Sequence, residues 1–236
     1  MTDPVTVPAS MVELRNVVVT YRAAGSAFSL LDIARLEIGR SSVVGLSGPS
    51  GSGKTTLLNL LAGLMQPSSG RIFVDGIELT ALSQSARDRF RTTRIGYVFQ
   101  AFNLIPALTA LGNVEVAMRL AGTLTASERR ARAEALLSRV GLAERMRHKP
   151  GQLSFGQMQR VGIARAIANR PKIILADEPT ASLEPRLARS TAQLLLDVAH
   201  EEKATLLLAT HDDAILTMMD RRIALADINR VGSSVS

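Results

Sequence analysis

The chain contains no cysteine in its 236 residues, and it has only four lysines and two tyrosines. The lack of cysteine excludes disulfide bonds and thiolate metal sites and fits a reducing compartment. No stretch approaches the 18 consecutive apolar residues of a membrane-spanning helix, because charges such as Arg35 and Glu37 interrupt the most hydrophobic N-terminal part. Residues 1–10 also lack the basic and then apolar pattern of a signal peptide. We therefore expect a soluble polypeptide that stays in the compartment where it is made.

The composition favours one folded domain that contacts anions. Hydrophobic residues make up 46% of the chain and charged residues 21%, which suits a substantial core and excludes general disorder. The 28 basic residues exceed the 21 acidic ones and give a net charge of +7. Such a balance favours contact with a nucleotide, a nucleic acid or an anionic lipid surface, although arginines on a solvated face produce the same composition.

A strand, a glycine-rich loop and a helix follow one another near residue 50. The apolar, β-branched run 41–47 predicts a short buried strand. The run 55–64 predicts a helix that ends near Gly63. One face of this helix is expected to carry four leucines, namely Leu57, Leu60, Leu61 and Leu64.

The loop between them, GPSGSGKT at 48–55, fits the phosphate-loop pattern G-x-x-x-x-G-K-[ST] in full. Its glycines allow backbone N–H groups to curl around phosphates, and the helix start adds its dipole. Lys54 can reach the terminal phosphates, and the Thr55 hydroxyl can bind Mg²⁺. The predicted nucleotide-binding residues of this segment are Gly48, Pro49, Ser50, Gly51, Ser52, Gly53, Lys54, Thr55 and Thr56.

Two further apolar runs, 172–177 and 204–211, predict strands that are buried on both faces of a parallel sheet. Both end in polar residues, and ligands of open α/β sheets bind beyond the carboxyl ends of strands. Beside a phosphate loop, Asp177 is predicted to hold Mg²⁺ directly or through water, and Glu178 to polarise an attacking water. Taken alone, a strand that ends in two acids is more often an ordinary solvated edge.

Three single residues have a functional and a structural interpretation. His211 closes the run 204–211 and can hydrogen-bond a γ-phosphate or orient the water, but a lone histidine is often a satisfied structural residue. Gln100 closes the run IGYVFQ and can join the Mg²⁺ and water shell, or it is a surface glutamine. Tyr21 can form a platform for an adenine ring, or it packs in the core.

The segment 153–160, LSFGQMQR, predicts a second helix start that can bind an anion. Ser154 and Gln157 have the spacing of a capping box, which leaves backbone donors and the positive end of a helix dipole at Phe155, Gly156 and Gln157. An ordinary capped helix has the same spacing. Because one phosphate loop already wraps one triphosphate, we infer that two copies face each other head to tail. Each copy would then offer LSFGQ to the nucleotide in the other's phosphate loop.

Between Gln100 and Gln159 the pattern is helical and predicts an insertion into an α/β core. The stretch 125–142 opens with a capping box at Thr125 and Glu128 and closes at Gly141. Its apolar residues on one side are Ala133, Leu136, Leu137 and Val140.

The order of GPSGSGKTT, Gln100, LSFGQMQR, ILADEP, ASLE and ATH resembles the ATP-binding-cassette (ABC) ATPases over nearly the whole chain. The segments 94–114 and 160–184 are most similar to the lipoprotein-release and macrolide-export branch, and a cell-division ATPase is close by. At the matching positions the resemblance implies an adenine-stacking Tyr21, a switch glutamine Gln100, a catalytic base Glu178 and a switch histidine His211. Glu178, His211 and Lys54 form the expected catalytic set.

The resemblance implies an α/β fold with a phosphate-loop (RecA-like) core, an inserted α-helical subdomain and a small antiparallel β subdomain. We expect one domain over 1–236, with the core in 1–100 and 165–236 and the helices in 101–164. The implied ligands are ATP and Mg²⁺, the latter held by Thr55, Gln100 and Asp177. The implied partners are a second copy and transmembrane permease subunits, which usually dock at 107–114. No nucleic acid is expected, and the implied location is the cytoplasmic face of the inner cell membrane, peripheral through the permease.

The expected function is ATP hydrolysis that drives export or extraction of a lipoprotein, peptide, drug or lipid-like substrate through a separate membrane subunit. The alternative is an ATPase of the cell-division type, which regulates a membrane partner without transport. A DNA-repair ATPase would suit the net charge, but 236 residues leave no room for its usual coiled coils or extra domains. A cassette that only binds nucleotide is disfavoured by the presence of Lys54, Glu178 and His211.

Three positions depart from the family pattern. Phe155 stands where the signature normally has glycine, so its side chain must turn away from the phosphate or crowd it. Glu184 stands where the loop after the two acids normally ends in aspartate. The dipeptide at 39–40 is glycine-arginine, where glycine-glutamate is usual.

Overall fold

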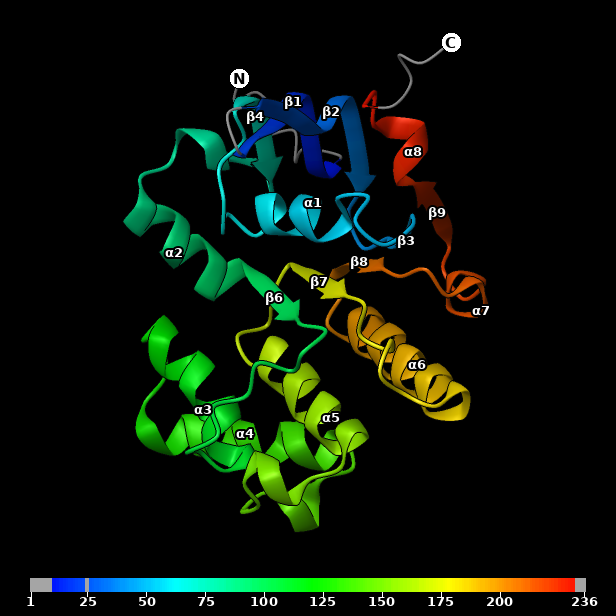
Figure 1. Ribbon diagram of the computed structural model, residues 1–236. Coiled ribbons are helices and arrows are strands. Elements are labelled where there is room, and N and C mark those ends of the chain that lie inside the picture. The colour runs from blue at the N-terminus through cyan, green and yellow to red at the C-terminus, as the bar shows by residue number, and fades with distance from the viewer. Residues whose placement is uncertain (1–9, 24–25, 232–236) are drawn as a thin grey trace, which may run out of the picture.

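The computed structural model describes residues 10–23 and 26–231, which form two sheets and a set of helices (Figure 1). Residues 1–9, for which the sequence predicts no signal peptide, lie outside the described residues. No helix in the described part is long and apolar enough to cross a membrane.

A parallel sheet with strand order β6-β7-β8-β3-β9 carries the site at the carboxyl ends of its strands. Strands β7 and β8 are buried at every residue, as their continuous apolar pattern predicts. The five strands are β3 (Val43–Ser47), β6 (Ile95–Val98), β7 (Ile173–Asp177), β8 (Thr205–Ala209) and β9 (Arg221–Ala224). The three strands predicted from the sequence are confirmed. However, β8 ends at Ala209, so His211 lies in the following loop and does not end the strand.

A second sheet is antiparallel and has strand order β2-β1-β4-β5. Its inner face and one face of the parallel sheet share a hydrophobic cluster with helix α1 (Lys54–Leu61), which lies between the two sheets in Figure 1. The predicted small antiparallel part is therefore confirmed. Its strands are β1 (Ser10–Ala23), β2 (Ser26–Gly39), β4 (Ser69–Val74) and β5 (Ile77–Glu78).

Helices cover the other face of the parallel sheet and extend away from it. Figure 1 shows α3, α4 and α5 gathered at the end of the molecule opposite the antiparallel sheet. A second hydrophobic cluster joins these helices and α6 to the parallel sheet. The α-helices after α1 are α2 (Gln84–Arg94), α3 (Ala110–Ala121), α4 (Ala126–Arg139), α5 (Phe155–Ala166), α6 (Pro185–Glu201), α7 (Asp213–Leu216) and α8 (Leu225–Ile228). Short 3₁₀ helices lie at η1 (Leu79–Ala81), η2 (Ala143–Arg145) and η3 (Pro150–Gln152).

The predicted helical stretch 125–142 corresponds to α4. Thr125 caps it, and Thr125 and Glu128 form both hydrogen bonds of the capping box. Its predicted apolar residues are buried, and Gly141 follows the helix with a φ of 77°. The division into a core and a subdomain at 101–164 stays a prediction.

The prediction that Leu64 shares the buried face of α1 is wrong. The helix ends at Leu61, and Gly63 adopts a left-handed φ of 65°. The N–H of Leu64 then donates to the carbonyl of Asn59 at 2.9 Å, which completes a Schellman motif. Leu64 therefore lies beyond the helix and is 47% exposed.

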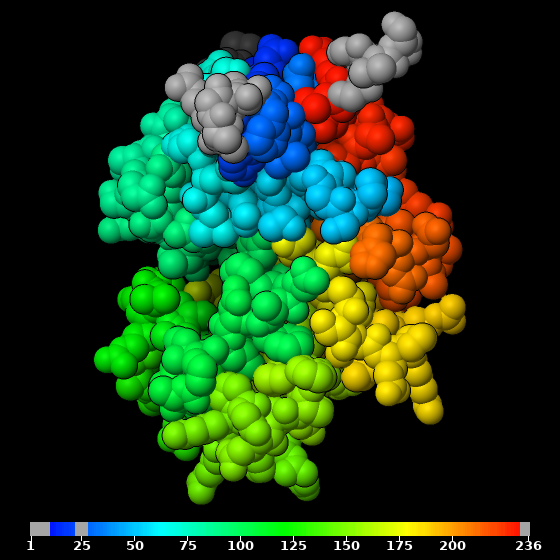
Figure 2. Space-filling view, viewed as in Figure 1, coloured from blue at the N-terminus to red at the C-terminus, as the bar shows by residue number. Residues whose placement is uncertain are grey.

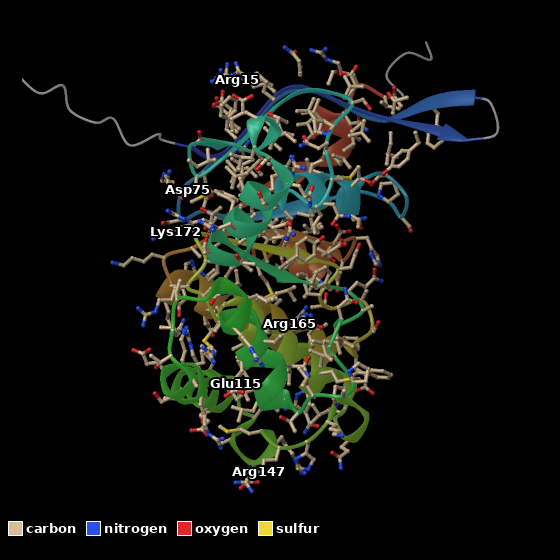
Figure 3. The ribbon with its side chains drawn as sticks, turned by 90° about the vertical axis from the view of Figure 1, so that its left-hand side faces the viewer. Arg15, Asp75, Glu115, Arg147, Arg165 and Lys172 are labelled. Carbon is tan, nitrogen blue, oxygen red and sulfur yellow. The ribbon has the colours of Figure 1, made fainter. Side chains whose placement is uncertain are left out.

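The glycine-arginine dipeptide at 39–40 has a structural explanation. The carboxylate of Asp75, in the turn between β4 and β5, accepts hydrogen bonds from Arg40 at 2.6 Å and from Arg94 at 2.8 Å. Only 11% of the Asp75 side chain is exposed, so the two arginines neutralise a mostly buried charge. Figure 3 shows Asp75 at the edge of the antiparallel sheet. A glutamate at position 40 would place a second carboxylate beside Asp75.

Candidate functional site

The phosphate loop has the backbone geometry that its glycines predict. Gly51 and Gly53 have φ values of 77° and 107°, which non-glycine residues adopt only with strain. A Cβ atom on Gly53 would also lie 2.8 Å from the Leu31 side chain. Helix α1 begins at Lys54, so its first N–H groups, which have no partner within the helix, are available to an anion.

A cavity of ≈ 290 Å³ lies over this loop. In Figure 2 the cyan segment with the phosphate loop, the yellow segment after β7 and the orange segment after β8 meet on one face of the molecule. The cavity is lined by Leu30, Ser50, Gly51, Gly53, Lys54, Thr55, Thr56, Gln100, Glu178 and His211. All but Leu30 were predicted from the sequence. Leu30 comes from β2, where no motif distinguishes it from the other apolar residues of the strand.

The side chain of Lys54 is buried within the loop. Its Nζ donates to the carbonyls of Gly48 at 2.7 Å and Pro49 at 3.1 Å, and it lies 3.3 Å from Oε1 of Glu178. The hydroxyl of Ser52 is also buried and has no hydrogen-bond partner among the described residues. A buried ammonium group, an unpartnered hydroxyl and free backbone donors fit the oxygens of a polyphosphate.

The side-chain oxygens of Thr55 and Asp177, the predicted Mg²⁺ ligands, lie next to each other. The Thr55 hydroxyl donates to Oδ1 of Asp177 at 3.1 Å. Burial raises the pKa of the Asp177 carboxyl, and the hydrogen bond from Thr55 opposes this shift in part. In the described part of the chain, no three His, Cys, Asp or Glu side chains are clustered to hold a metal ion. This donor set fits Mg²⁺, which is usually bound by one or two protein oxygens together with substrate phosphates.

Glu178 occupies a strained backbone position at the end of β7. Its φ is 44°, and its N–H donates to the carbonyl of Ala209 at 2.9 Å. Left-handed non-glycine residues cost free energy and are concentrated at functional sites. This conformation directs the carboxylate to Lys54 on one side and to Nδ1 of His211, at 3.0 Å, on the other. The predicted base and the predicted switch histidine are therefore in direct contact.

Gln100 and Tyr21 are placed differently. Gln100 is exposed and lines the cavity, and its role near the metal and the water stays a prediction. Tyr21 is 39% exposed on β1 and stacks on Phe28, with ring centroids 5.9 Å apart. Tyr21 is not among the residues that line the cavity, so its role as an adenine platform stays a prediction.

The segment LSFGQ forms the predicted capped start of α5. Ser154 Oγ accepts from the N–H of Gln157 at 3.3 Å, and Gln157 Oε1 accepts from the N–H of Ser154 at 3.0 Å. A Cβ atom on Gly156 would lie 2.6 Å from Leu187, so this position needs glycine for the contact of α5 with α6. Phe155, in contrast, is 63% exposed. The cavity of the same chain is not lined by any of the four predicted signature residues, Ser154, Phe155, Gly156 and Gln157.

The site combines a phosphate loop after an interior strand of a parallel sheet, a hydroxyl and carboxylate pair that suits Mg²⁺, and a glutamate at the end of β7, two strands away in the same sheet. These features together define a P-loop nucleoside triphosphatase. Residues 31–181 match the family model described as ABC transporter. The chain belongs to this family. It is an ATP-binding-cassette ATPase, and it binds ATP with Mg²⁺.

Relatives of known sequence agree with this assignment. An ABC transporter ATP-binding protein of Mycobacterium tuberculosis, Rv0073, is 46% identical over 94% of this chain and 68% of its own length. The methionine import protein MetN 2 of Pseudomonas aeruginosa is 44% identical, over 92% of this chain and 64% of its own length. The lipoprotein-releasing system protein LolD of Hyphomonas neptunium is 42% identical, over 92% of this chain and 95% of its own length.

Solved structures show the same fold. The ATP-binding cassette MJ0796, in a dimeric post-hydrolysis state with ADP and Pi, has a TM-score of 0.84 and 41% identity over 91% of this chain and 94% of that chain. A second dimeric structure of MJ0796 has the same TM-score and 40% identity.

Proposed function

We propose that two copies of this chain close around two ATP molecules and drive a membrane transporter. The observation that carries this proposal is the separation of two anion-binding helix starts. The start of α1 lines the cavity, whereas the start of α5 does not. A second copy in head-to-tail orientation would bring Ser154, Gly156 and Gln157 to the nucleotide over the first copy's phosphate loop. MJ0796 is dimeric in both solved structures, which supports the pairing of two copies.

The residues around the cavity suit hydrolysis of the γ-phosphate bond. Lys54 and the N–H groups of α1 bind and orient the phosphates, and Lys54 exchanges its contacts with the loop carbonyls for contacts with phosphate oxygens. Mg²⁺ at Thr55 and Asp177 would neutralise charge on the phosphate oxygens. Glu178 orients the attacking water and accepts its proton, while His211 holds the Glu178 carboxylate and can contact the γ-phosphate.

The γ-phosphate controls closure because it alone contacts both copies. A ligand shifts a conformational equilibrium only by its differential affinity for the two states. ATP makes contacts with the start of α5 in the closed pair, and release of phosphate after hydrolysis removes them. Closure would therefore follow the triphosphate and opening would follow its loss.

The transport step requires a separate membrane subunit. We place the chain at the cytoplasmic face of the cell membrane, peripheral through a permease that contacts 107–114 at the start of α3. The cargo we propose is a lipoprotein, peptide, drug or lipid-like molecule that is exported or extracted. LolD and MetN 2 differ in the cargo that their names state although they are about equally similar to this chain, so the membrane subunit is expected to set the cargo.

Purified Glu178→Gln protein tests the closed pair. With ATP and Mg²⁺ it should elute from a sizing column as a dimer, because nucleotide is bound but not cleaved. Absence of a dimer while nucleotide is measurably bound would contradict the proposal. Steady-state phosphate release by the unsubstituted protein, abolished by Lys54→Ala, provides the matched test of hydrolysis.

A further inference from the structure

Phe155 lies at the first position of α5, and its ring contacts a segment of its own chain. Its neighbour Gly156 faces Leu187 of α6, and this contact fixes which side of the helix start is buried. The Phe155 ring lies on the other side and stacks on Phe102, with ring centroids 6.1 Å apart and an angle of 25° between the ring planes. Such a distance is typical of favourable aromatic pairs. The ring therefore turns toward its own chain.

Phe102 belongs to the short segment that follows Gln100. Phe102 and Asn103 have left-handed φ values of 58° and 48°, and two consecutive residues of this kind are costly unless surrounding contacts hold them. These contacts come from α5. The guanidinium group of Arg165 donates to the carbonyls of both residues. Figure 3 shows Arg165 within the helical part of the molecule.

Helix α5 thus contacts this segment from both of its ends. Arg165 is near the last turn and holds the backbone, whereas Phe155 is at the first residue and holds the Phe102 ring. Gly162 lies between them, and a Cβ atom there would be 4.0 Å from the Phe102 carbonyl, so the segment passes close to the helix. Gln100, which lines the cavity, precedes Phe102 by two residues, so a short stretch of backbone joins the cavity to the segment that contacts α5.

Simple burial does not explain the Phe155 side chain. It remains 63% exposed after stacking, so it removes little apolar surface from water. The capping box of α5 uses Ser154 and Gln157 and does not involve the ring. The contribution specific to Phe155 is its link to Phe102.

We infer that Phe155 is a positioning residue for ATP-driven closure, an inference that rests on the proposed function. In each copy, Gln100 lies at that copy's own nucleotide, whereas the start of α5 faces the nucleotide of the partner. The stack of Phe155 with Phe102 couples the positions of these two parts. Binding of the triphosphate near Gln100 would then orient Ser154 and Gly156 for the second site. The substrates and products of the reaction are unchanged, and the effect is on the step that closes the pair.

A double-mutant cycle tests this coupling with Phe155→Ala, Phe102→Ala and the double variant. The readouts are kcat, the ATP concentration at half-maximal rate, and equilibrium nucleotide binding at protein concentrations that keep the chain monomeric. An aromatic pair of ordinary strength predicts that each single substitution lowers kcat by about two- to tenfold. Monomer binding should be unchanged, and the double variant should be no slower than either single one.

Conservative and unrelated substitutions serve as controls. Phe155→Tyr keeps the stack and should restore the rate. Leu120→Ala removes another exposed apolar side chain, 71% exposed at the end of α3, and should have no effect on the rate of the purified subunit. Phe155→Trp introduces the single tryptophan of this chain. Its emission should change when ATP is added to the Glu178→Gln background, and the change should need a higher ATP concentration when Phe102→Ala is also present.

Two results would overturn the inference. One is a rate that rises or stays the same in Phe155→Ala, which would show that the ring crowds the partner's nucleotide or has no role. The other is a double variant whose loss equals the product of the single losses, since independent residues behave in this way. Failure of the proposed function itself is recognised separately, because the Glu178→Gln parent would then form no dimer with ATP.

Discussion

Replacing Glu184 by aspartate is expected to stabilise the protein by completing the N-terminal cap of α6. Glu184 is the residue that precedes the helix and has the extended backbone of a capping position, but its side chain makes no capping hydrogen bond. Pro185 at the first helical position has no N–H, so Arg186 and Leu187 carry the next two donors that a cap can satisfy. Aspartate is among the best capping residues, and its carboxylate is one methylene nearer to these donors.

The expected gain in the free energy of unfolding comes from the new capping hydrogen bond alone. Glu184 is exposed, so no packing is lost, and both residues carry one negative charge, so the interaction with the helix dipole is the same. A cap hydrogen bond typically contributes about 1 kcal/mol. For a chain of this size, 1 kcal/mol raises the unfolding midpoint by roughly 2–4 °C.

The assay is thermal and urea unfolding of the nucleotide-free protein, followed by circular dichroism. Glu184→Asp should raise the midpoint without changing the slope of the urea transition. Glu184→Gln is the matched control, because it removes the charge without adding a cap and should lower stability by a few tenths of a kcal/mol. A Glu184→Asp protein that is no more stable than the unsubstituted chain would refute the assignment of this residue as an unsatisfied cap.

Two further predictions concern buried carboxylates. Arg40→Ala should lower the free energy of unfolding, measured with urea, by roughly 1–3 kcal/mol, because Asp75 loses a charged hydrogen-bond donor. The comparison is the same substitution in Asp75→Asn protein, where Arg40→Ala should cost less because position 75 has no charge to neutralise. Asp177→Asn should stabilise the nucleotide-free protein. The Asp177 carboxyl of the unsubstituted chain has a pKa that is higher in the folded than in the unfolded state, so the folded protein loses stability as the pH rises from the unfolded-state pKa toward the folded-state pKa. Its advantage over the unsubstituted chain should be largest at neutral pH and disappear in acid, while Mg²⁺-dependent hydrolysis is lost.

The sequence predicts well those parts of the site that depend on local backbone geometry. The phosphate loop and the capped start of α5 are of this kind, because each motif specifies its own backbone geometry or hydrogen bonds within a few residues. The placement of Glu178 near Lys54 also follows, since the strands of one parallel sheet bring their carboxyl ends to the same edge, here from β3 and β7 on either side of β8.

The missed features depend on packing between distant segments. The ion pair of Arg40 and Asp75 joins residues 35 positions apart, and no motif relates them. The direction of Phe155 is decided by the contact of Gly156 with Leu187, which a capping pattern does not contain. Sequence spacing gave two outcomes for this ring, and only the three-dimensional contact distinguishes them.

The central claim, a nucleotide site completed by a second copy, is tested most directly by cross-linking. Because the chain lacks cysteine, Ser50→Cys in one population and Gln152→Cys in another provide single defined thiols at the phosphate loop and just before the start of α5. Both are exposed, and both variants carry Glu178→Gln and tags of different size. With ATP and Mg²⁺, a short thiol cross-linker should join the two populations, and with ADP it should not. An ATP-loaded dimer that yields no such product would contradict the account.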